Sequence, residues 1–150
     1  MKRIDDPGVV DELTSRLAQL SVETSRRWGT LTAHEMVCHL IDSYRFAIGE
    51  RRVSAVDTIF TRTFLRLIAL HTPIPWPQGV PTRPEVDPKR EGTRPAQFAS
   101  DRDTLAAIVR AFPSYAGPFA PHPAFGPMTR REWMMWGHRH ADHHFRQFGI

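Results

Sequence analysis

The segment Thr129–Gly149, TRREWMMWGHRHADHHFRQFG, carries the strongest signals for the fold. Thr129 followed by Glu132 is the pattern of a capping box, which satisfies free N–H groups at the start of a helix. The glycine near its end stands where helices usually stop. His140 and His144 are four residues apart, so on a helix their side chains project from one face, one turn apart. The segment therefore predicts a long helix that can present two imidazoles to one metal ion.

A third imidazole is expected from a second helix, predicted over residues 31–49, LTAHEMVCHLIDSYRFAIG. Thr32 and Glu35 form another capping-box pattern, and a glycine again follows the last apolar residue. His39 lies at the edge of the apolar face, so we expect its side chain to point inward. That face consists of Met36, Val37, Leu40, Ile41, Tyr44 and Ile48.

Three more helices follow from apolar residues at three- and four-residue steps. They are predicted over residues 8–20, residues 55–70 and a segment that begins at Ser100. Ser100 with Asp103 repeats the spacing of a capping box. For the helix at 55–70, the residues expected to face inward are Ile59, Phe60, Phe64, Leu67 and Ile68.

The segment from residue 72 to residue 95 contains seven of the 13 prolines, which exclude a regular helix or a central strand there. A connection this long can run along a whole bundle. No segment alternates with a period of two. We therefore predict an all-α fold, a four-helix bundle with a long Pro-rich crossover loop, formed by residues 1–150 as a single domain.

Composition narrows the classes of function. The net charge of +4 and the pI of about 10.0 come from 20 basic residues interleaved with 16 acidic ones, so the sequence predicts no nucleic-acid binding. The single cysteine, Cys38, excludes an internal disulfide and fits a reducing compartment. The N-terminal residues do not resemble a secretory signal, and no apolar run is long enough for a membrane span. These patterns predict a cytoplasmic protein without membrane contact.

Three neutral imidazoles, from His39, His140 and His144, are a common way to hold a first-row divalent metal while leaving coordination positions open. Such a metal can make a bound water acidic, hold a thiolate or polarise a carbonyl. The alternative for the pair on the last helix is a surface-facing, histidine-rich helix end, which the helix dipole favours. The alternative for His39 is a hydrogen-bonded core histidine.

The histidines also occur in a familiar order. The run His39-Leu40-Ile41-Asp42-Ser43, with His140, His143, His144 and Gln147 in the last helix, resembles the DinB/YfiT-like superfamily. The tail HPAFGPMTRREWMMWGHRHADHHFRQFG resembles a branch of it that is catalogued as a domain of unknown function. With Trp28-Gly29 before the second helix, the resemblance covers essentially the whole chain.

This resemblance implies a four-helix bundle with a crossover between its second and third helices, and metal ligands at His39, His140 and His144. It further implies one divalent metal ion per chain (nickel, zinc or iron), a small-molecule substrate, a low-molecular-weight thiol as a candidate cofactor, and a homodimer. Members include metal-dependent hydrolases and thiol transferases. Many members carry His-Arg-Gly-Gln where this chain has His144-Phe145-Arg146-Gln147, which leaves substrate and thiol open.

The sequence suggests roles for several other side chains near these positions. His143 lies about 100° around the helix from His144 and is assigned to the surface or to a supporting contact. His122 is assigned to turn packing, Arg146 to the surface, and Cys38 to a buried structural thiol. His138 is expected to face away from His140, and His34 is expected to be exposed. Trp136 is expected to belong to the core or to line a pocket above the metal. Asp42 and Asp142 are the nearest carboxylates in sequence that could accept a ring N–H.

Overall fold

The computed structural model describes residues 1–150 and is all-helical, with no strands and one isolated bridge between His122 and Gly126. It confirms the all-α prediction. The α-helices are α1 (Val9–Ala18), α2 (Ala33–Ala47), α3 (Arg66–His71), α4 (Phe98–Ala111) and α5 (Arg130–Phe148), and α3 continues a π-helical turn at Thr61–Leu65.

The ends of α2 and α5 follow from their sequences. Thr32 caps α2, where its side chain accepts from the N–H of Glu35 and the Glu35 carboxylate accepts in return. Thr129 and Glu132 make the same reciprocal pair at the start of α5. Gly149 ends α5 with a φ of 76°, a left-handed conformation that favours glycine. The capping boxes predicted for these two helices are confirmed.

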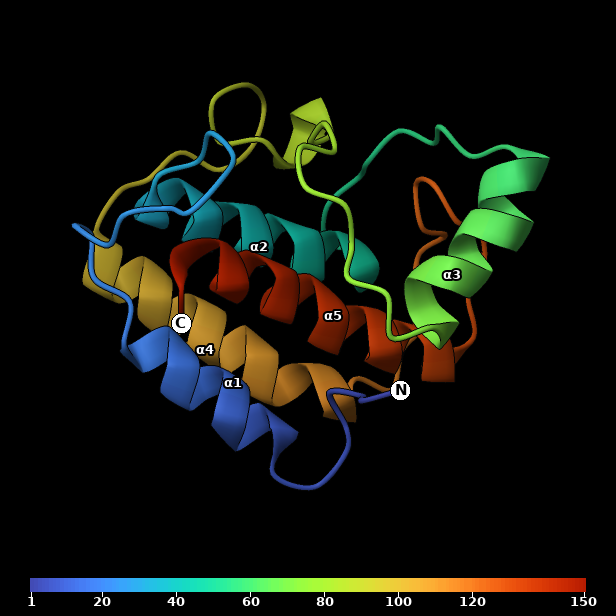
Figure 1. Cartoon of the computed structure of the whole chain (residues 1–150), viewed down its shortest axis with the longest axis horizontal. Helices are drawn as coiled ribbons and strands as arrows, with labels where there is room; N and C mark the ends of the chain where they lie inside the picture. The colour runs from blue at the N-terminus through green and yellow to red at the C-terminus, as the bar shows by residue number, and fades with distance from the viewer.

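The core lies where α1 and α2 each pack against both α4 and α5 (Figure 1). Trp133 and Trp136 of α5 are almost fully buried, as is Tyr44 of α2. The Tyr44 hydroxyl donates to the carbonyl of Gly137 at 2.6 Å, so a hydrogen bond inside the core fixes α2 against α5. This contact holds the two helices that carry the candidate metal ligands.

The start of α4 differs from the prediction. The helix begins at Phe98, and its capping residue is Gln97, whose side chain accepts from the N–H of Ser100. Ser100 is therefore inside the helix, and its spacing to Asp103 is not a capping box. The carboxylate of the nearby Asp101, in the first turn of the helix, accepts from His34 and from the N–H of Ala96. A glutamine cap has no strong sequence signature, which explains the error.

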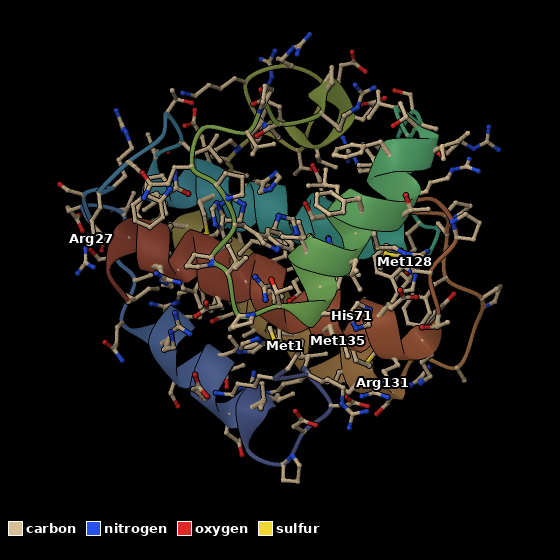
Figure 2. All side chains as sticks on the ribbon, turned by 45° about the vertical axis from the view of Figure 1, so that its right-hand side comes forward. Met1, Arg27, His71, Met128, Arg131 and Met135 are labelled. Atoms are coloured by element: carbon tan, nitrogen blue, oxygen red, sulfur yellow. The ribbon has the colours of Figure 1, made fainter.

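The predicted helix at 55–70 forms only from Ile59 onward, and its apolar stripe faces outward. Ile59 is 85% exposed, and Phe60, Phe64 and Leu67 are each more than half exposed. Only Ala69 and Leu70, near its end, are buried, while Arg66 reaches the body through its side chain, which donates to the carbonyl of Pro127 and pairs with Glu132. Figure 2, turned so that this end comes forward, shows α3 in front of α5 with His71 at its lower end. Periodicity shows that a face is apolar but not what covers it.

The segment from 72 to 95 contains no α-helix and only a short 3₁₀ turn at Pro84–Val86, as its prolines predict. It runs across the molecule from the end of α3 towards the start of α4 (Figure 1). On its way it brings Trp76 and Val86 to the histidines on α5 and α2. None of the helices has both the length and the apolar character needed to cross a membrane.

Candidate metal centre

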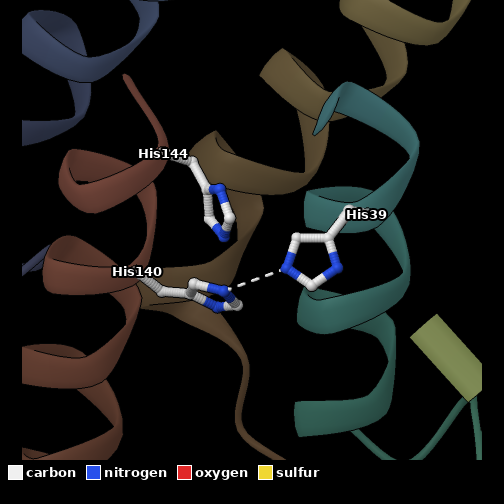
Figure 3. Close-up of side chains that lie close together, drawn as sticks. All are labelled: His39, His140 and His144. Atoms are coloured by element: carbon white, nitrogen blue, oxygen red, sulfur yellow. Dashed lines mark hydrogen bonds between the residues drawn. The ribbon is translucent and has the colours of Figure 1, made fainter. Parts of the chain in front are cut away.

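Three histidines from two helices meet between α2 and α5. One ring nitrogen each of His39, His140 and His144 lies within 4.8 Å of the others. The Nε2 atoms of His39 and His140 are 3.2 Å apart, the contact drawn as a dashed line in Figure 3. In that view all three rings point into the same space. The spacing of His140 and His144 predicted that these two meet, and His39, 101 residues before His140, was predicted to join them from its place on an apolar helix face and from the family resemblance.

The ring of His39 is oriented by the crossover segment. Its Nδ1 lies 2.8 Å from the carbonyl oxygen of Val86. A carbonyl can only accept a hydrogen bond, so Nδ1 carries the proton and donates. The neutral ring then has its lone pair on Nε2, the atom that faces His140. The short 3₁₀ turn at Pro84–Val86 therefore selects the tautomer of His39 that can bind a metal.

The ring of His144 is oriented by a glutamine one turn later. Its Nδ1 lies 2.9 Å from Oε1 of Gln147, and Gln147 Nε2 donates to the carbonyl of Trp28 at 2.8 Å. The second bond fixes which end of the amide is the acceptor, so Nδ1 of His144 donates and its lone pair lies on Nε2. Gly29 makes room for this amide, because a Cβ there would lie 2.3 Å from Gln147 Nε2.

These features fit a divalent metal ion. At a typical zinc–nitrogen distance of about 2.0–2.1 Å, two tetrahedral ligands lie roughly 3.3 Å apart, close to the separation of the His39 and His140 nitrogens. Two of the three rings have their lone pairs fixed on the inner nitrogen. Only His140, whose N–H is not fixed on its outer nitrogen, could point an N–H into this space. The three inner nitrogens therefore carry at most one N–H among them. A cation satisfies lone pairs that this arrangement otherwise leaves facing one another.

Burial keeps the rings in the neutral form that binds metals. His39 is 5% exposed, and burial lowers its pKa. Burial also lowers the pKa of His140 and of His144 well below the ordinary value for histidine, and the neighbouring imidazoles lower it further. Neutral imidazole is the ligand form, so no proton has to leave these side chains before metal binding near neutral pH.

Aromatic rings form the wall around His140. The Trp136 ring centroid lies 4.7 Å from that of His140, and Trp76 covers it from the crossover segment at 5.8 Å. Trp76 is itself held, since its indole N–H donates to the carbonyl of Ala69 at 2.8 Å. The outer nitrogen of His140, Nδ1, is buried without a hydrogen-bond partner. This ring is therefore oriented by packing and not by an acceptor.

The two carboxylates nearest in sequence do not support the histidines. Asp42 is fully buried and accepts from Arg51 at 2.9 Å and from the N–H of Thr93 at 2.6 Å. Asp142 pairs with Arg16 at 2.8 Å. The acceptors are instead the Val86 carbonyl and the Gln147 amide. The glutamine could have been found from its position three residues after His144, but a main-chain carbonyl leaves no sequence signal.

The remaining histidines have other environments. His143 is half-buried between Trp28 and Trp76, at centroid distances of 6.1 and 6.0 Å. His122 stacks on Phe125 and accepts two main-chain N–H groups at Nδ1, as expected for a turn-packing residue. Burial lowers the pKa of His122 to about 3. Arg146 is exposed, as predicted, and lies 4.0 Å from Asp142.

A second group of polar side chains joins α2 to the start of α4. His34, expected to be exposed, is half-buried and its Nε2 lies 2.7 Å from Oδ2 of Asp101. The Cys38 thiol lies 3.9 Å from the same oxygen. One carboxylate oxygen therefore accepts from several donors, an arrangement that ties the two helices together. Cys38 is fully buried, as predicted.

The buried position of Cys38 predicts that its thiol reacts slowly with alkylating reagents. Burial, with the nearby Asp101 carboxylate, raises the pKa of Cys38 to about 12. The reactive thiolate is then scarce below that pH. We expect the folded protein to react with iodoacetamide at pH 8 at least 100-fold more slowly than the urea-unfolded chain, measured by mass spectrometry. Equal rates in the two states would contradict the buried position.

Comparison with known proteins gives a family but no activity. Searches of curated proteins and of solved structures found no match. A family model matches residues 8–149, which is nearly the whole chain and includes all three histidines. The chain belongs to the family described as "Protein of unknown function (DUF1569)".

Proposed function

We propose that this protein is a metal-dependent enzyme in which His39, His140 and His144 hold one divalent ion, nickel, zinc or iron. The observation that carries the proposal is the convergence of three ring nitrogens with two of the outer N–H groups bound to fixed acceptors. Three ligands leave coordination positions free. We assign the reaction to hydrolysis or to transfer of a low-molecular-weight thiol onto a small molecule.

A bound metal of this kind supplies an acidified water or a stabilised thiolate. The chain's own residues supply the rest. Val86 and Gln147 hold the rings of His39 and His144 in one tautomer. Trp76 and Trp136 exclude water from one side of the site, which strengthens electrostatic interactions inside it.

We also propose that the fold is a four-helix bundle of the DinB/YfiT-like type. The packing of α1 and α2 on both α4 and α5 supports a four-helix bundle, and the crossover between α2 and α4 supports the DinB/YfiT-like type. That superfamily includes enzymes that use thiol cofactors, which is our reason for placing thiol transfer beside hydrolysis. Fold alone does not determine a reaction, so the site must be tested directly.

A second candidate is a non-catalytic helical bundle in which the metal is structural or sensory. The burial of His39 and the aromatic cover over His140 favour it. Cobalt(II) substitution distinguishes the two functions. A site with a free position changes its visible spectrum when a small thiol such as 2-mercaptoethanol is added, because sulfur enters the coordination sphere. A spectrum that does not respond to thiol or to azide supports the structural role.

Metal analysis of the untagged protein tests the site itself. We expect about one metal ion per chain, lost in both His39→Ala and His144→Ala. His71→Ala is the matched control, because His71 is a partly exposed histidine at the end of α3 whose contact is Glu132. A wild type that stays metal-free after loading with nickel, zinc and iron in turn would overturn the proposal. Equal metal content in His39→Ala and wild type would remove His39 from the ligand set.

A further inference from the structure

A hollow of about 210 Å³ lies on the outer side of α5. Its floor is formed by His138, Asp142 and Arg146, which recur every four residues on one face of the helix. This face is turned about 160–200° from the face that carries His140 and His144. Trp76 and two prolines of the crossover form one wall, and the first two residues of the chain form another. The hollow is therefore separate from the candidate metal centre.

The floor of this hollow contains an unpartnered polar side chain. His138 is 9% exposed, and neither of its ring nitrogens has a hydrogen-bond partner. A neutral imidazole carries one N–H donor and one acceptor, and leaving either unpaired in a buried position is unfavourable. The ring lines the hollow while both of its nitrogens are covered, so a rotation of the ring toward an occupant would supply the missing partner.

The charge around the hollow is positive. Lys2, Arg139 and Arg146 line it, and Arg16 lies behind Asp142. The facing carboxylates are Asp142, which lies 2.8 Å from Arg16 and 4.0 Å from Arg146, and Glu12, which pairs with both Lys2 and Arg16. Four cations thus face two carboxylates.

Arg139 is the clearest unneutralised charge among these cations. Its guanidinium donates to the main-chain carbonyls of Thr72 and Ile74 and makes no ion pair with a carboxylate. It is also buried, which makes an unbalanced charge more costly than at the surface. An anion in the hollow would reduce this imbalance.

We propose that the hollow binds a small oxyanion, the carboxylate or phosphate group of a small molecule. The ring N–H of His138 donates to it, and the charges of Arg146 and Arg139 attract it. The Trp76 ring and the adjacent prolines contact its apolar part. Because Trp76 also lies against His140, the bound anion borders the wall of the metal centre. The proposal requires no metal and stands apart from the enzymatic assignment.

Nitrogen NMR of the histidine rings tests this site at constant pH and ionic strength, with chloride as the balancing anion. The probes are inorganic phosphate and acetate. We expect saturable shifts of the His138 ring nitrogens with one or both probes. A response to phosphate alone indicates a phosphoryl ligand, and a response to acetate alone indicates a carboxylate. Shifts that grow linearly without saturation, or no shift, would overturn the proposal.

Two variants, Arg146→Gln and His138→Phe, and one control variant locate the binding. Arg146→Gln removes an exposed charge beside the hollow, and we expect it to weaken binding at least threefold while the chain stays folded. Arg131→Gln, an exposed arginine at the start of the same helix, is the matched control and should bind as the wild type does. Because Trp76 lines the hollow, we also expect the anion to change the tryptophan fluorescence with the same saturation, and His138→Phe should abolish this change. Equal affinity in wild type and both variants would place the anion elsewhere.

Discussion

Asp42→Ala is expected to lower the free energy of unfolding by about 3–5 kcal/mol, the range for removing one partner of a buried ion pair. The Asp42 side chain is completely inaccessible. It accepts from Arg51 and from both the N–H and the hydroxyl of Thr93. The substitution leaves these donors without their acceptor. Arg51 also donates to the carbonyls of Glu85 and Glu91, so the loss extends to the crossover segment.

Urea unfolding followed by circular dichroism measures this effect. Asp103→Ala is the control, because Asp103 is an exposed aspartate in α4 and its loss should change stability by less than about 0.5 kcal/mol. A destabilisation of Asp42→Ala below about 1 kcal/mol would show that Arg51 and Thr93 find water or other partners. It would also mean that the crossover is held mainly by its apolar contacts.

Gly29→Ala is expected to weaken metal binding by about 10- to 100-fold, the usual effect of losing a group that orients a ligand. Gly29 has a φ of 79°, and a Cβ there would lie 2.3 Å from Gln147 Nε2. The amide must move, so His144 loses the acceptor that fixes its tautomer. Competition with a chelator of known affinity measures the change. The variant should remain folded, since the backbone strain is about 1 kcal/mol.

Gly49→Ala separates the backbone strain of Gly29→Ala from its clash with Gln147. Gly49 has a similar φ of 83°, but nothing lies within 4 Å of the position of an added Cβ. It therefore carries the backbone strain alone, and its metal affinity should equal that of the wild type. Equal losses of affinity in both variants would attribute the effect to general destabilisation. Wild-type affinity in Gly29→Ala would show that Gln147 does not orient His144.

The parts of the fold that the sequence predicted are those with local physical causes. Thr32 and Thr129 each begin a helix because the matching glutamate three residues later completes a reciprocal pair. The four-residue spacing of His140 and His144 needs only helical geometry. The edge of an apolar face, which must be buried against another helix, placed His39 inside the fold, and the family resemblance in the sequence added it to the pair as a ligand.

The parts that the sequence did not predict depend on tertiary structure. Most apolar residues of the helical segment 59–71 face outward because only Ala69 and Leu70 near its end are buried against the body, and no local pattern contains that information. His34 is half-buried because Asp101 comes to it from α4, 67 residues away. Val86 reaches His39 through its main chain. In each case the partner is determined by the path of a long connection, not by neighbouring residues.

The two residues that accept hydrogen bonds from the histidine rings, Val86 and Gln147, should differ in how much they vary among related sequences. The carbonyl that orients His39 belongs to the main chain, which every amino acid provides, so position 86 can accept many substitutions without loss of that bond. The acceptor of His144 is a side chain, and few residues can replace Gln147. Natural variation across the family should therefore show a restricted glutamine, a restricted glycine at position 29 that makes room for it, and a position 86 that is restricted by its burial but not by this hydrogen bond. A supporting contact as important as the others would then be invisible to any comparison of residue identities.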